Sequence, residues 1–131
     1  MPFIYKIDKE HRLILSTGSG TLTLGDFLTH QSRLLEDPDF DPSYSQLADF
    51  TQVTQLRPVP GGVEKVAQKD VFSPTSRRAI VVKNDLQYGF ARMFQIHRDL
   101  SGERGIRVFR NIDEALDWIF SKTDAAADER A

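Results

Sequence analysis

The run Arg78-Ala79-Ile80-Val81-Val82 is the stretch of sequence that decides the fold. It is continuous in apolar and β-branched residues, with no alternation between apolar and polar positions. A strand that is buried on both faces of a sheet has this composition, because helices cover both sides of it. The run therefore predicts a central strand of an α/β protein.

Segments on either side of this strand alternate between strand and helix patterns. Apolar residues recur at the three-and-four spacing of a helix face, or form short β-rich runs bounded by turn residues. The predicted strands are 3–7, 12–17, 44–51, 78–82 and 106–109, and the predicted helices are 24–35, 63–71, 86–100 and 112–119. Gly18-Ser19-Gly20 is expected to break the second strand.

The resulting order is β-β-α-β-α-β-α-β-α. A hairpin at the start, followed by strands that alternate with helices, predicts a mostly parallel, mixed five-stranded sheet with helices packed on it. We expect one domain over residues 1–120 and a disordered tail over 121–131, where no apolar face continues. Thr23, Asn84 and Asn111 are the expected N-caps of three helices.

Composition excludes several classes of function. The 131 residues are 40% hydrophobic and 27% charged, contain no cysteine and carry a formal net charge of -2. This balance offers no broad positive field for nucleic acid, and no window approaches the ~18 apolar residues of a membrane span. Together with the missing secretory signal pattern, it predicts a cytoplasmic protein.

Four segments carry a resemblance to a known family. They are Asp49-Phe50-Thr51-Gln52-Val53-Thr54, Arg77-Arg78-Ala79-Ile80-Val81-Val82, Tyr88-Gly89-Phe90-Ala91-Arg92-Met93-Phe94 and Glu114-Ala115-Leu116-Asp117-Trp118-Ile119. In these segments and in the order of elements, the chain resembles the STAS domain family, and more closely its uncharacterised bacterial SpoIIAA-like branch. The resemblance implies the STAS fold and a role in regulation or protein interaction. The antagonists of that family carry a phosphorylatable serine where this chain has residues 55–62, which contain no hydroxyl group.

The turn Arg57-Pro58-Val59-Pro60-Gly61-Gly62 is one candidate binding site. Free N–H groups at the start of the following helix attract anions, and Arg57 could close such a site beside Gly61 and Gly62. The alternative is that these residues only set a tight turn. No Gly-Lys-Ser or Gly-Lys-Thr sequence follows, as a phosphate-binding loop would require.

Two further groups are candidates for ligand or partner binding. Asp49, Thr51 and Thr54 stand where a parallel strand is expected to end, which is where α/β sheets bind ligands. Tyr88 and Arg92 share an expected exposed face of their helix. Local hydrogen bonds, or a solvated helix surface, are the alternatives for these residues.

No catalytic or metal-binding pattern is present, and no cofactor is predicted. His11, His30 and His97 match no spaced ligand motif, and no serine hydrolase elbow occurs. The first hypothesis is therefore a non-enzymatic regulatory or protein-interaction module, with a homodimer compatible with the sequence. The alternative is a small carrier for a lipid or another apolar or anionic ligand. An enzyme that acts on a phosphorylated or carboxylated metabolite is the third hypothesis.

Overall fold

The computed structural model describes residues 2–121 and contains the nine predicted elements in the predicted order. The strands are β1 (Phe3–Asp8), β2 (Leu13–Thr23), β3 (Ser45–Arg57), β4 (Arg78–Val81) and β5 (Ile106–Phe109). The helices are α1 (Leu24–Glu36), α2 (Gly62–Ala67), α3 (Asp85–Leu100) and α4 (Ile112–Ile119). Apart from Ser121, the tail predicted over 121–131 lies outside the described residues, and the domain boundary at 120 stays a prediction.

The five strands form one mixed sheet in the order β1-β2-β3-β4-β5. β1 pairs with β2 antiparallel, and the three following pairs are all parallel. The predicted fold class is therefore confirmed. The run that starts at Arg78 forms β4, an interior strand as predicted, and each residue of β4 is buried. The strand in the middle of the sheet is its neighbour β3.

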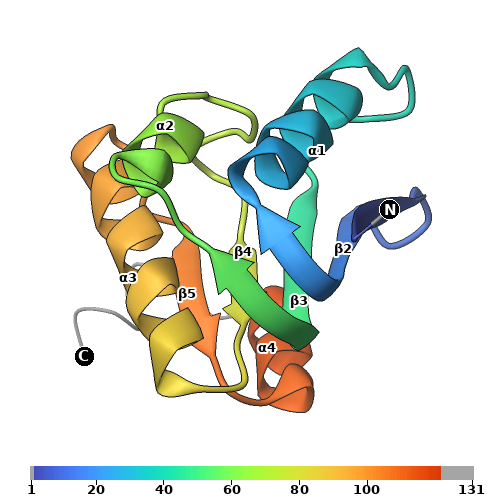
Figure 1. Cartoon of the computed structure of the whole chain (residues 1–131). Helices are drawn as coiled ribbons and strands as arrows, with labels where there is room; N and C mark the ends of the chain where they lie inside the picture. Colours follow the sequence, from blue (N-terminus) through green and yellow to red (C-terminus); the bar gives the residue numbers. More distant parts are fainter. Residues whose placement is uncertain (1, 122–131) are drawn as a thin grey trace.

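The sheet separates two layers of helices (Figure 1). One face carries α4, whose Trp118 is buried beside Leu47, Ala79 and Val81. The other face carries α1 and α3, and α2 lies between these two helices and contacts both. Alternation along each strand assigns its side chains to the two layers, because successive residues of a strand point to opposite faces.

The predicted ends of β2 and β3 are wrong, because both strands continue and pair with each other beyond these ends. Gly18-Ser19-Gly20 does not break β2; the strand continues to Thr23 through two register shifts against β3. A side chain at Gly18 would crowd Leu22, Val53 and Phe50, so the glycine allows β3 to pass close by. β3 then runs six residues beyond the predicted end at Thr51, because its second half pairs with the far half of β2.

The predicted inward face of α3 is right only in part. The apolar spacing within 86–100 predicts that one stripe faces the sheet, made of Leu86, Phe90, Met93, His97 and Leu100. Phe90 and His97 are half-buried, but Leu86, Met93 and Leu100 are 61%, 42% and 80% exposed. Gln87 and Arg98 are buried instead. Both polar side chains are satisfied by hydrogen bonds inside the protein, and this removes the usual penalty for burying them.

The predicted helix caps are confirmed. Thr23 and Asp26 form a complete capping box at α1, since each side chain bonds the other residue's backbone N–H. The side chains of Asn84 and Asn111 accept a hydrogen bond from the third residue of α3 and α4. Among residues 2–121, no helix has the length and apolar character needed to cross a membrane.

Candidate functional site

A pocket of about 170 Å³ lies between one face of the sheet and the helices α1, α2 and α3. Strands β2, β3 and β4 form its floor, and the segment from Arg57 to Val59 forms part of its rim. An apolar cavity of ~150 Å³ is enough to bind benzene. The pocket is therefore large enough for a small organic molecule.

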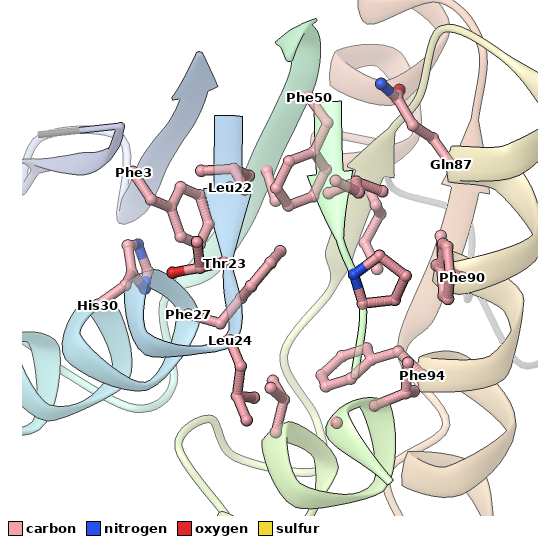
Figure 2. Close-up of a pocket in the computed structure, with 18 of the residues that line it drawn as sticks. Phe3, Leu22, Thr23, Leu24, Phe27, His30, Phe50, Gln87, Phe90 and Phe94 are labelled. Carbon is pink, nitrogen blue, oxygen red and sulfur yellow. The ribbon is translucent and has the colours of Figure 1, made fainter. Parts of the chain in front are cut away.

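Phenylalanine dominates the lining. Phe3, Phe27, Phe50, Phe90 and Phe94 come from the four elements β1, α1, β3 and α3 and border the same space (Figure 2). The rings of Phe3, Phe27 and Phe50 contact one another with centroids 5.3–5.9 Å apart, while Phe90 and Phe94 face them from α3. Contacts among these rings make the wall on the α1 side apolar and well packed.

Some polar side chains on the pocket wall belong to a buried chain of hydrogen bonds. Arg78 donates through Nε to Gln46 Oε1 at 3.0 Å, and Gln46 donates through Nε2 to Ser16 Oγ at 3.0 Å. Ser16 Oγ lies 2.9 Å from Nε2 of His30. Arginine can only donate, so the amide of Gln46 has a fixed orientation and its Nε2 donates to Ser16 Oγ. The Ser16 hydroxyl either donates to Nε2 of His30 or accepts from it, according to the tautomer of the ring.

His30 is neutral at physiological pH. It is 5% exposed and stacks on Phe3 with ring centroids 4.1 Å apart. Burial, together with the positive charge of Arg78, lowers the pKa of His30 to about 4. The protonated form is disfavoured because the ring is removed from water and lies near a cation.

The charge of Arg78 is balanced inside the protein. Arg78 Nη1 and Arg98 Nε both bond the carboxylate of Glu103, at 3.0 Å and 2.8 Å, and Arg98 also pairs with Asp70 at 2.8 Å. Burial lowers the pKa of Arg78, and its pairing with Glu103 opposes this shift. The guanidinium also lies 4.3 Å from the ring centre of Phe72. The pocket therefore contains a cation with its counter-ion already in place.

Side chains of α1 and α3 hold the short helix α2 over the pocket. Gln31 Nε2 donates to the carbonyl oxygen of Val66 at 2.8 Å, and Arg98 Nη1 donates to that of Ala67 at 2.9 Å. The last carbonyl groups of a helix have no partner within the helix, so these bonds satisfy them. The place of His97 on the apolar stripe of its helix predicts a semi-buried side chain; it is half-buried, and its Nε2 lies 3.5 Å from Oε1 of Glu64 of α2.

The structure places only some of the predicted site residues at this pocket. Arg57 and Gly62 line it. Gly61 is the N-cap of α2 with a positive φ of 75°, which is the turn geometry expected of the alternative interpretation. α2 has six residues and contacts α1 and α3, whereas the sequence predicted a helix over 63–71 against the sheet.

The other predicted site residues lie elsewhere. Asp49 Oδ1 accepts hydrogen bonds from the N–H and hydroxyl groups of Thr51, at 2.8 Å and 2.7 Å. Thr54 is exposed within β3. Tyr88 and Arg92 line a separate polar groove beside β5. The predicted residues therefore form no single site.

Several pocket residues escaped the sequence analysis, namely His30, Gln46, Arg78 as a polar wall residue, and Phe94. A polar residue at an inward-facing position of an otherwise apolar strand is the sequence feature that could have indicated the polar part of the pocket wall. Gln46 and Arg78 are such residues on paired strands, and their Cα atoms are direct partners in the register. Among residues 2–121, no three His, Asp or Glu side chains gather where they could hold a metal ion.

With this geometry in place, the chain can be compared with known proteins. No protein-family model and no curated protein sequence matches it. It does resemble a crystal structure of an uncharacterized protein from the DUF3478 family, with a SpoIIAA-like fold, from Shewanella loihica PV-4. The two chains share 19% sequence identity over 89% of this chain and 91% of that chain, with a TM-score of 0.54.

The chain thus has a SpoIIAA-like fold, which confirms the resemblance found in the sequence. The fold and the pocket define its class as a mixed α/β domain with an aromatic-lined pocket under three helices. At this level of identity the likeness concerns the fold, and function has to be argued from the site itself.

Proposed function

We propose that this chain is a non-enzymatic binding module that holds a small, largely apolar molecule in the pocket between the sheet and α1, α2 and α3. The observation that carries the proposal is the convergence of five phenylalanine side chains on one space. Small-molecule sites are concave, mostly apolar and furnished with a few polar groups that fix orientation. The pocket fits this description.

The polar groups on the wall, and the carboxylate that is bonded to Arg78, support binding rather than catalysis. Neutral His30 is bonded to Ser16, and the carboxylate of Glu103 is bonded to two arginines. A general base needs free access to a substrate proton and a pKa near the working pH. Both groups are engaged with the protein, and the pKa of His30 is about 4.

A titration with toluene tests the proposal. Two-dimensional amide NMR of the isotope-labelled protein should show saturable shifts at residues that line the pocket, including Phe27 and Phe94. Replacing Ala91, which is 7% exposed on the pocket wall, by phenylalanine should fill the space and abolish these shifts. Met93→Phe is the matched control, because it adds a ring to the exposed side of the same helix. Shifts that survive Ala91→Phe, or that never saturate, would contradict the proposal.

Protein interaction through α3 is a second candidate function. Leu86, Met93, Ile96 and Leu100 expose 42–80% of their surface on this helix. Exposed apolar residues that gather on one element mark contact surfaces. We infer that a second copy of this chain covers this face of α3, so that the protein is a homodimer. Light scattering should give twice the chain mass for the wild type and the mass of one chain for Ile96→Glu. A monomeric wild type at high concentration would remove this candidate.

A further inference from the structure

The most informative side chain in the pocket is Gln31 of α1. It is 8% exposed, and its Nε2 donates to the carbonyl oxygen of Val66 at 2.8 Å. A carbonyl oxygen can only accept, so this bond fixes which end of the amide is nitrogen. The other end, Oε1, is fully buried and accepts no hydrogen bond from any described residue.

A buried acceptor without a donor is costly. Its desolvation is worth about 1–3 kcal/mol, and folded proteins retain few such groups. Among the described residues the other such atom is Trp118 Nε1, which belongs to the α4 layer on the opposite face of the sheet. Of these two residues, Gln31 is the one that lines the pocket. Its missing donor is therefore expected from a molecule in the pocket.

The surrounding charges indicate what kind of donor fits. Arg78 and Arg98 are matched by Glu103 and Asp70, and His30 is neutral. Arg78 donates through Nε and Nη1, and no described residue accepts a hydrogen bond from its Nη2. A carboxylate in the pocket would place its own lone pairs against those of Gln31 Oε1, which is repulsive. It would also find no positive charge that lacks a counter-ion. A neutral group that can both donate and accept, such as a hydroxyl, suits this wall better.

From the unpartnered Oε1 of Gln31, and resting on the binding function proposed above, we propose that the pocket selects neutral alcohols: apolar molecules whose hydroxyl group donates to Gln31. The five phenylalanines surround the apolar body, and Gln31 recognises the hydroxyl. Polar contacts of this kind provide specificity in an otherwise apolar site, because an analogue that lacks the donor leaves the acceptor buried and unpaired.

A pair of isomers isolates the hydroxyl. The compounds 1-hexanol and pentyl methyl ether have the same atoms and nearly the same length, but only the alcohol can donate a hydrogen bond. Titration of the wild-type protein, followed by two-dimensional amide NMR, gives both dissociation constants. One hydrogen bond to a buried acceptor corresponds to about tenfold, so we expect 1-hexanol to bind about tenfold more tightly than the ether. Hexanoate should bind more weakly than 1-hexanol.

Gln31→Leu removes the acceptor and keeps a side chain of similar size. The preference for 1-hexanol over the ether should fall from about tenfold to near parity, mainly because the ether binds better. Ser32→Leu is the matched control: it adds the same side chain to the next, exposed position of α1 and should keep the full preference.

The outcomes separate this inference from the function on which it rests. Equal affinities of the wild type for the two isomers, with shifts at the pocket, would overturn the role of Gln31 and leave the apolar pocket standing. Absence of binding by either isomer would overturn both. If Gln31→Leu does not fold, the comparison of isomers on the wild type still decides the inference.

Discussion

Glu103 is the residue on which the buried charges depend. Its side chain is 1% exposed and lies within 3.0 Å of both Arg78 and Arg98. Replacing it by glutamine keeps the shape but leaves two buried cations facing a neutral amide, which destabilises a protein by about 3 kcal/mol or more. Urea unfolding should show this loss for Glu103→Gln and almost none for the exposed control Glu36→Gln. A loss below ~1 kcal/mol would contradict the geometry of this cluster.

His30 makes the stability of the protein depend on pH. Its pKa is about 4 in the folded protein and near 6.5 in the unfolded chain. The unfolded chain therefore takes up the proton first as the pH falls. The contribution of His30 to the free energy of unfolding is fully present above pH 6.5. It is lost as the pH falls from 6.5 to 4, and the total loss is about 3 kcal/mol.

A variant isolates this effect from that of other acidic groups. His30→Gln offers Ser16 an amide group in place of Nε2 and cannot titrate in this range. Urea unfolding at several pH values should show a smaller fall in stability between pH 7 and pH 4 for the variant than for the wild type. Parallel curves for the two proteins would contradict the low pKa of His30.

At the scale of single elements, two glycines give opposite predictions. A glycine at position 89, inside the predicted helix 86–100, is expected from the sequence to permit a close approach to the sheet, but a Cβ at this position would meet no atom within 4 Å. Gly89→Ala should therefore stabilise α3 by up to ~1 kcal/mol. A Cβ at Gly105, just before β5, would overlap the backbone carbonyl of Ser76, so Gly105→Ala should destabilise the protein by about 1–3 kcal/mol. Thermal unfolding of both variants tests the pair, and equal effects would contradict it.

The sequence predicts the elements better than it predicts their orientation. Caps such as Thr23 and Asn84 are local, because the side chain bonds a backbone group three residues away. The inward face of α3 depends on distant partners: Arg98 turns inward because Glu103, Asp70 and the carbonyl group of Ala67 receive its hydrogen bonds. A periodicity based on apolar residues treats arginine as exposed, so it placed Leu86, Met93 and Leu100 on the inward face in error, while Phe90 does face inward.

At the scale of the whole molecule, the fold follows from the sequence more fully than the pocket does. The order of elements and the continuous run at β4 were enough to predict a mixed sheet with parallel strands and covered faces. The pocket depends on five phenylalanines from four elements, and no local pattern distinguishes a ring that fills a core from one that borders a cavity. The predicted site at the glycine turn supplied Arg57 and Gly62, two residues of the wall.

We expect the space between the sheet and the three helices to accept an apolar guest. A crystal of the protein equilibrated under xenon tests it most directly, because xenon enters apolar cavities and is located by its anomalous scattering. We expect a xenon site surrounded by Phe27, Phe50, Phe90 and Phe94. A crystal structure in which these rings close on one another, with no xenon between the sheet and α2, would contradict it.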